Sequence, residues 1–414
     1  MPVYLDHAAT TPMLPEAISA YADALSMVGN PSSIHSQGQN AKRMLEEARE
    51  RVAESLGADP IEIVFTSGGT ESVNLAIKGL FWARNAEAAS AGQGNAGQGN
   101  AGPGHLGVGP VRRRILVPRG EHHATIDAAL WLEQHEGAVI DWIPLDSVGR
   151  VSLPALASAL SNSGSGAQDD VALITVLSAN NEVGTIQPLD EIVALASAHG
   201  VPVHADAVSA YGHLPIDFAS SGLAALSVSA HKIGGPFGIG ALVLSRTAAV
   251  VPLIHGGGQQ RSVRSGTQDA PAAISFGAAA SHPHPDLRPL RDRIIAGVLE
   301  RVPSAVLRGD AVDRLPNNAH FTFPGCEGDS LLFLLDTAGV SVSTGSACQA
   351  GIPEVSHVLV AMGLDEGEAR GALRITVGHT TTEADVDVFL DALPAAVERA
   401  TRAGFSDRLV GHAR

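Results

Sequence analysis

The chain has 414 residues, of which 45% are hydrophobic and 17% charged, with a formal net charge of −16. This composition excludes wholesale disorder, and the length predicts two domains because one core rarely exceeds about 250–300 residues. The negative charge argues against binding to nucleic acid or to an anionic membrane surface. The chain starts without the pattern of a secretory signal and has only two cysteines, so we expect a cytoplasmic protein with neither a disulfide framework nor a multi-cysteine metal site.

The predicted elements alternate between helices and short apolar strands. Residues 40–56 repeat apolar side chains at helical spacing and form the first predicted helix. Helical segments then separate the predicted strands, which are residues 63–66, 114–117, 171–178, 201–205, 225–230 and 239–245. Such alternation is typical of an α/β protein whose mostly parallel sheet is covered by helices on both faces.

The pattern changes after a Gly-rich stretch at 255–271 and becomes α+β. We therefore expect a large domain over residues 15–260 and a smaller α+β domain over 261–414, to which residues 1–14 are also assigned. Within the large domain, residues 86–110 contain a short repeat of Gly, Gln, Asn and Ala. Such a segment buries too little apolar area to offset its ordering entropy, so a flexible surface insertion is predicted there.

Two residues stand where predicted strands end. Lys232 is one of only three lysines and follows an apolar run in SVSAHKIGGPFGIG. Ligands of open α/β sheets bind beyond the carboxyl ends of strands, and burial makes a lysine amine nucleophilic, so Lys232 is a Schiff-base candidate or a structural loop lysine. Asp206 ends the strand before it, where a carboxylate either pairs with the ring nitrogen of pyridoxal phosphate or caps a helix.

Further polar groups lie in predicted loops or strands. The turn FTSGGTES opens a helix and suits a monophosphate, although an ordinary helix start has the same appearance. Cys348 lies in the small-residue loop TGSACQAG, where it is either a nucleophile or a free surface thiol. Cys326 is expected to pack as a small hydrophobic residue. For Arg374, in LRITVG, the two alternatives are a side chain that binds a carboxylate and one that is exposed to solvent. His122 and His123 follow another strand, where one stacks on a planar cofactor or both are structural.

Taken in order, these residues resemble a cysteine desulfurase of the NifS/IscS type, within the class-V aminotransferase family. The resemblance rests on YLDHAATTP, GNPSSIHSQG, IVFTSGGTES, GEHHA, NNEVGTIQP, HADA, SAHKIGGPFGIGAL, HGGGQQRSVRSGT, TGSAC and LRITVG. It covers nearly the whole chain except about residues 86–112 and the C-terminal end. It implies a fold-type I architecture, pyridoxal 5'-phosphate as cofactor and a homodimer.

The resemblance also implies a role for each matching residue. Lys232 corresponds to the lysine that binds the cofactor covalently, Asp206 to the partner of its ring nitrogen, and His122 to the histidine that stacks on the ring and assists proton transfer. Arg374 and Asn181 correspond to the grip on the substrate carboxylate, with Asn181 also near the cofactor. The other matching cofactor contacts are Gly69, Thr70, Ser229 and His231, with Thr267 supplied by the other subunit.

Cys348 corresponds to the cysteine that takes the sulfur. The implied reaction converts L-cysteine to L-alanine and leaves a persulfide on Cys348 for an acceptor protein, either an iron–sulfur scaffold or an enzyme of tRNA or cofactor thiolation. One position departs: the family pattern D-A-x-Q here reads D-A-V-S, so Ser209 replaces a glutamine that bonds the cofactor's ring oxygen, and a water would have to bridge the gap.

Two alternatives stay open. A selenocysteine lyase or related desulfinase shares the cofactor machinery and depends less on Cys348. A non-enzymatic assembly platform is suggested by the change at Ser209, although Lys232, Cys348 and Arg374 are all present.

Overall fold

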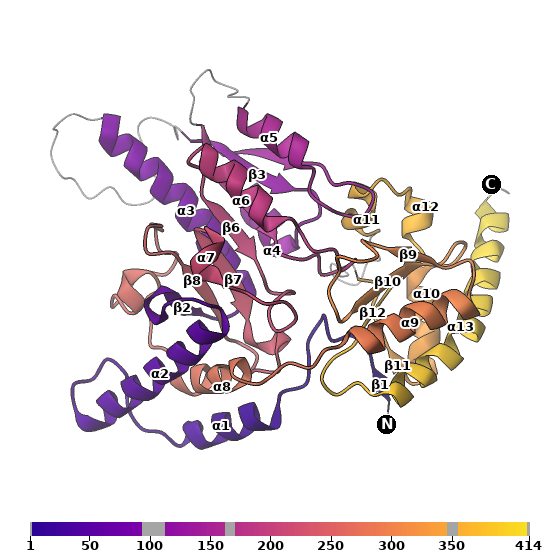
Figure 1. Ribbon diagram of the computed structural model, residues 1–414, viewed down its shortest axis with the longest axis horizontal. Coiled ribbons are helices and arrows are strands. Elements are labelled where there is room, and N and C mark those ends of the chain that lie inside the picture. Colours follow the sequence, from indigo (N-terminus) through magenta and orange to yellow (C-terminus); the bar gives the residue numbers. More distant parts are fainter. Residues whose placement is uncertain (1, 93–111, 162–169, 346–354, 412–414) are drawn as a thin grey trace.

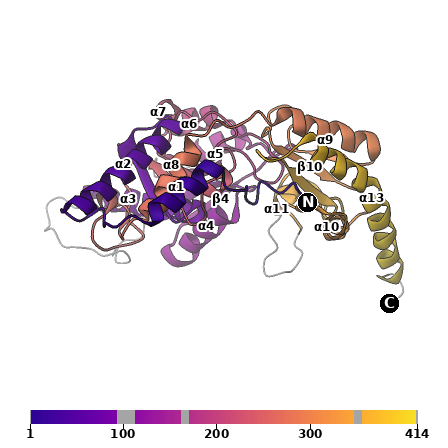
Figure 2. The same cartoon turned by 90° about the horizontal axis from the view of Figure 1, so that it is seen from below.

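The computed structural model of the protein describes residues 2–92, 112–161, 170–345 and 355–411. A large α/β body and a smaller body lie side by side (Figure 1), and the N-terminus lies in the smaller one (Figure 2). Residues 86–92 of the flexible insertion predicted at 86–110 are helical, and the rest of the predicted insertion lies outside the described residues. In the part of the chain that is described, no helix carries an apolar stretch long enough to span a membrane.

A seven-stranded sheet forms the centre of the large body, in the order β2-β8-β7-β6-β5-β3-β4. Neighbouring strands are parallel except β8, which is antiparallel to both β2 and β7. The strands are β2 (Ile63–Thr66), β3 (Arg114–Pro118), β4 (Val139–Ile143), β5 (Val171–Leu177), β6 (Val203–Asp206), β7 (Ala225–Ser229) and β8 (Gly240–Leu244). The predicted mostly parallel sheet is confirmed, and β4 is the strand that the sequence did not indicate.

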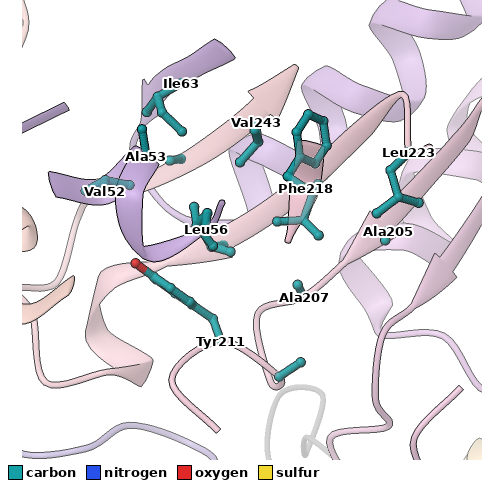
Figure 3. Packing of buried hydrophobic residues seen from close by; sticks show 14 of the residues in the cluster. Val52, Ala53, Leu56, Ile63, Ala205, Ala207, Tyr211, Phe218, Leu223 and Val243 are labelled. Atoms are coloured by element: carbon teal, nitrogen blue, oxygen red, sulfur yellow. The ribbon is translucent and has the colours of Figure 1, made fainter. Parts of the chain in front are cut away.

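Both faces of this sheet are apolar, because successive side chains of a strand point to opposite sides. In β2, Val64 belongs to the core under α3 (Gly69–Gly92) and α4 (His123–Glu136), whereas Ile63 and Phe65 belong to the core on the other face. That second face is covered by α2 (Ser36–Ser55), α5 (Leu153–Ser161), α6 (Leu189–Ala198) and α7 (Phe218–Ser221). Figure 3 shows part of this core, where Leu56 after α2 and Phe218 of α7 meet strand side chains such as Val243.

The smaller body has its own sheet and core. Its three strands are antiparallel in the order β12-β10-β9, and β1 pairs in parallel with β11. Its strands are β1 (Val3–Tyr4), β9 (Val306–Arg308), β10 (Asn318–Thr322), β11 (Val340–Ser341) and β12 (Ala372–Thr376). Its helices are α9 (Arg288–Arg301), α10 (Gly328–Thr337), α11 (His357–Ala361), α12 (Glu366–Ala369) and α13 (Glu383–Gly411). Short 3-10 helices in the chain are η1 (Pro60–Glu62), η2 (Ala230–Lys232) and η3 (Gln260–Ser262).

The change from one core to the other falls later in the chain than the expected boundary at 260/261. Helix α8 (Ala270–Ala280) packs against α2 and α1 (Pro15–Leu25), and its Phe276 is fully buried in the core of the large body. Beyond α8, the first residue of the smaller core is Leu287, and Val3 and Leu5 from the N-terminus join the same core. The Gly-rich stretch at 255–271 therefore forms a loop of the large body, because the small apolar residues of α8 fit between two helices of that body.

Candidate active site

The carboxyl ends of the parallel strands meet at one edge of the large sheet and form the floor of a cleft of about 340 Å³. The smaller body closes the opposite side with Arg374, Ser343 and Gly345. Ten of the predicted site residues line this cleft, namely Gly69, Thr70, His122, Asn181, Asp206, Ser209, Ser229, His231, Lys232 and Arg374. The structure thus brings together residues from strand ends that lie far apart in the sequence.

Lys232 ends the 3-10 helix η2, which follows β7 directly. Its Nζ donates to the backbone oxygens of Ala8 at 2.5 Å and Ala9 at 3.0 Å. Burial lowers the pKa of Lys232 to about 8, and the positive charge of Arg374 acts in the same direction. An amine with such a pKa is partly neutral near physiological pH, as a nucleophile or proton acceptor requires.

Asp206 is the last residue of β6 and is almost fully buried. Its Oδ1 accepts a hydrogen bond from Val208 N at 2.9 Å, so it both supports the turn after the strand and faces the cleft. Burial raises the pKa of Asp206 to about 6, and the Val208 N–H and the Lys232 ammonium oppose that rise. A cation placed beside Asp206 would hold it ionised at neutral pH.

His122 is the N-cap of α4, and its Nδ1 accepts from Ala124 N at 3.1 Å. This contact requires an unprotonated Nδ1 and leaves the proton of the neutral ring on Nε2. Burial lowers the pKa of His122 to about 4, and the Lys232 charge lowers it further. The imidazole is therefore neutral at physiological pH and held in one orientation.

The N-terminus of α3 provides an anion-binding turn. Gly69 begins this helix, and a Cβ at that position would lie 2.7 Å from Val208 Cγ2, so a side chain there would force Val208 to move. The first turn of a helix presents free N–H groups and the positive end of the helix dipole. His231 lines the same cleft, and burial lowers its pKa to about 4, so it offers a hydrogen bond and not a charge at neutral pH.

Arg374 reaches the cleft from β12 and is 4% exposed, which excludes the solvent-facing alternative. Its Nη1 donates to the backbone oxygen of Asn181 and its Nη2 to Asp6 Oδ1, each at 2.9 Å. As expected from strand alternation, Leu373 and Ile375 point into the smaller core. A buried guanidinium fixed on two sides is suited to bind a carboxylate.

A protein-family model described as Aminotransferase class-V matches residues 3–90 and 109–389 of the chain. The chain belongs to the class-V aminotransferase family. An IscS-like cysteine desulfurase from Mycobacterium tuberculosis is 50% identical over 412 residues, which are 97% of this chain and 98% of that protein. The predicted resemblance to the NifS/IscS type is thereby confirmed.

Solved structures of the family agree with this assignment. A structure described as a NifS-like protein has a TM-score of 0.81 at 31% identity, with 96% of this chain and all of that chain covered. A structure of SspA in complex with cysteine has a TM-score of 0.76 at 30% identity, with 92% of this chain and 99% of that chain covered. The fold-type I architecture expected from the sequence is confirmed by these class-V structures.

Two predicted site residues are not in the cleft of the described chain. Thr267 is exposed and does not line the cleft. Cys348 lies outside the described residues, which end on either side at Gly345 and Val355. Cys326 is buried in the smaller core, as expected, with its Sγ 3.2 Å from Thr401 Oγ1.

Sequence reasoning missed three residues that shape the site of this class-V enzyme. Asp6 pairs with Arg374, and its motif YLDHAATTP had been singled out only as a whole. Glu121 is buried beside His122, within GEHHA. His357, from α11, donates its Nε2–H to the Glu121 backbone oxygen at 2.9 Å and had no local signal of its own.

Proposed function

We propose that this protein is a pyridoxal 5'-phosphate-dependent cysteine desulfurase that converts L-cysteine to L-alanine and retains the sulfur on Cys348. The observation that carries the proposal is the meeting of Lys232, Asp206, His122 and Arg374 in one cleft. The names of the relatives as cysteine desulfurases, and the cysteine held by a structural neighbour, support the substrate.

The residues of the cleft fit the cofactor. The Lys232 amine donates to two backbone carbonyls, and no hydrogen bond or ion pair joins it to a carboxylate among the described residues, so it is available for a covalent link to an aldehyde. Asp206 suits a protonated ring nitrogen, and the glycine turn before α3 suits the phosphate, with Ser229 and His231 beside it. Ser209 also lines the cleft, and it stands where the family resemblance implies a glutamine. When bound, pyridoxal phosphate supplies an electron sink for the bonds at the substrate Cα.

The protein's own groups supply the remaining chemistry. Arg374 binds the substrate carboxylate, and its hydrogen bond to the Asn181 backbone oxygen sets the direction of the guanidinium. The released Lys232 amine accepts and returns the Cα proton, since its pKa of about 8 suits both tasks. His122 is neutral with its proton on Nε2, so it would offer a hydrogen-bond donor to a cofactor held in the cleft.

Cys348 is proposed to attack the substrate sulfur as a thiolate and to carry the product persulfide. One described segment ends at Gly345, which lines the cleft and precedes Cys348 by three residues. This position supports the assignment. The persulfide then passes to an acceptor protein, either an iron–sulfur scaffold or a thiolation enzyme. We further propose a cytoplasmic homodimer in which Thr267 completes the phosphate site of the other subunit.

The holoenzyme treated with L-cysteine tests this function. We expect alanine and sulfide in equal amounts when a thiol reductant is present, and added sulfur on Cys348 in mass spectra when it is omitted. Cys348→Ala should lose the added sulfur and most turnover, whereas the matched control Cys326→Ala should keep both. Turnover of selenocysteine but not cysteine by the wild-type enzyme would favour the selenocysteine lyase alternative, and turnover of neither would favour the assembly platform.

A further inference from the structure

Glu121 connects three elements beneath the cleft. It lies between β3 and α4, directly before His122, and is 1% exposed. Its Oε1 accepts from Leu177 N at the end of β5, at 2.9 Å. Its backbone oxygen accepts from His357 Nε2, also at 2.9 Å. The residue therefore fixes the segment that carries His122 to the neighbouring strand and to α11.

The second carboxyl oxygen of Glu121 has no hydrogen-bond partner among the described residues, and it is buried. No ion pair to Glu121 occurs in the part of the chain that the structure describes. The charged group that acts on it is another carboxylate, Asp206, whose strand pairs Leu177 with Asp206 directly. An ionised carboxylate with one hydrogen bond, no cation and an anionic neighbour is strongly unfavourable inside a protein.

The electrostatics of the site agree with this geometry. Burial raises the pKa of Glu121 well above its usual range, and the Asp206 charge raises it further, while the Leu177 N–H lowers it. His122, His123 and His357, which surround the same turn, are not paired with its carboxyl group in the described residues. Among the described residues packed against Glu121, that single N–H is the one group that favours its ionised form.

We propose that Glu121 is a protonated, neutral carboxylic acid in the folded enzyme and acts as a positioning residue for His122 and Asp206. A neutral Glu121 leaves Asp206 as the one carboxylate charge at this part of the cleft floor. An ionised Glu121 would raise the proton affinity of Asp206, because two like charges raise each other's proton affinity, and Asp206 would then be less suited to pair as an anion with a protonated ring nitrogen. The proposed effect on the ring nitrogen rests on the proposed cofactor, whereas the protonation state of Glu121 does not.

Infrared difference spectra test the protonation state directly. Wild-type protein at neutral pH should show the carbonyl stretching band of a protonated carboxylic acid, and Glu121→Gln should lose it in both the apoenzyme and the holoenzyme. Asp206→Asn is the matched control, because it removes the neighbouring carboxyl group and should leave the Glu121 band in place. If Glu121→Gln removes only carboxylate bands, Glu121 is ionised and the proposal is overturned.

The absorption of the bound cofactor supplies the second readout. Replacing a neutral acid by the neutral amide of Glu121→Gln should leave the pH midpoint of that absorption nearly unchanged, whereas removing a buried charge beside Asp206 should move it by about one unit or more. Glu121→Leu removes the acceptor of Leu177 N, and should weaken cofactor binding about 10-fold and lower kcat more than it raises KM. Wild-type kinetics and cofactor affinity in Glu121→Leu would refute the positioning role. Lack of desulfurase activity in the wild-type enzyme would refute the proposed function and leave the infrared result standing.

Discussion

The cleft and the junction between the two bodies both gather ionisable side chains, but they do so in opposite ways. In the cleft, groups of opposite sign face one another: Lys232 is near Asp206, and Arg374 pairs with Asp6 at 2.9 Å. The junction instead gathers five histidines from four segments of the chain. We call His7, His213, His282, His284 and His379 the junction histidines.

The junction histidines face mainly one another. His7 faces His379, and His213 faces both His7 and His284. His379 also faces His282 and Glu16, which is the acidic group beside them. Four of the five line a cavity of about 20 Å³, roughly the space of one water, and Lys232 closes its cleft side.

This difference shows how neighbouring groups determine whether a buried ionisable side chain is charged or neutral. Burial lowers the pKa of His7 and of His213 to about 4, and the neighbouring imidazoles add to the effect. Asn317 Nδ2 donates to Nε2 of His213 at 3.0 Å, which also requires an unprotonated nitrogen. In the cleft, the opposite charges of Lys232 and Asp206 therefore oppose the loss of charge that burial causes. At the junction, the neighbouring histidines instead add to the effect of burial, so the junction is neutral and sensitive to acid.

The largest effect is expected from removing the central cation of the cleft. Lys232→Ala should lose the covalent cofactor link and lower turnover by about 1,000-fold or more, because it removes both the link and the proton acceptor. Borohydride reduction followed by peptide mapping measures the link. The control Lys78→Ala removes a lysine that lies 4.2 Å from the Trp131 ring. In this control variant, borohydride should still fix the cofactor to Lys232. A reducible lysine link that survives in Lys232→Ala would show that another residue binds the cofactor.

A substitution in the wall of the cleft formed by the smaller body should weaken substrate binding more than cofactor binding. Arg374→Ala removes a charge-assisted contact of roughly 1.5–3 kcal/mol and should raise KM for L-cysteine about 10- to 150-fold, with cofactor affinity changed much less. Arg370→Ala is the control, because Arg370 is an exposed arginine paired with Glu366 two residues before β12. An unchanged KM in Arg374→Ala would show that Arg374 does not bind the substrate and that its role is the structural ion pair with Asp6.

The junction histidines should contribute to the loss of stability in acid, together with His122 and His231 of the cleft. Between about pH 6.5 and pH 4 the unfolded chain protonates His7 and His213 while the folded chain does not, so stability falls as the pH falls. Each such histidine contributes a slope of up to about 1.4 kcal/mol per pH unit. His213→Gln should flatten that slope in urea unfolding at pH 7 and pH 5, and the exposed His199→Gln should leave it unchanged. Equal slopes for all three proteins would place the acid sensitivity elsewhere.

The smallest effect concerns the one departure from the family pattern. Ser209→Gln should restore a direct donor to the ring oxygen and move the pH midpoint of the cofactor absorption by about one to two units, because a full hydrogen bond to a charged group is worth roughly 1.5–3 kcal/mol. Spectrophotometric titration measures the shift. A spectrum, titration and turnover all equal to wild type would show that position 209 does not contact the cofactor.

The sequence predicted those site residues and strands whose signal lies in neighbouring residues. It did not predict features that depend on contacts between residues far apart in the chain. Lys232 and Asp206 follow apolar runs, so their position at strand ends is visible in the chain itself. Strand β4 was missed because it is an edge strand with Asp141 within it, whose carboxylate pairs with Arg114 on the neighbouring strand. The contact between Asp6 and Arg374 joins opposite ends of the sequence and has no periodic signal.

The core boundary and the remaining site residues illustrate the same limit. Helix α8 looks like the start of a new region after the Gly-rich loop, and only its contacts with α1 and α2 place it in the large body. The neutral state assigned to Glu121 depends on the absence of a partner, which no sequence pattern encodes. The roles of Thr267 and Cys348 stay predictions, since the first needs a second subunit and the second lies outside the described residues.

The N-terminal segment that holds the Lys232 amine has a consequence for how the protein is made. Ala8 and Ala9 are positioned by neighbours near the other end of the chain, because Val3 pairs with Val340 and Asp6 with Thr376. A ribosome therefore releases β1 long before its partner strand exists, and closing so long a loop delays this contact relative to local ones. The reactive lysine consequently acquires its final surroundings only after nearly the whole chain has been synthesised.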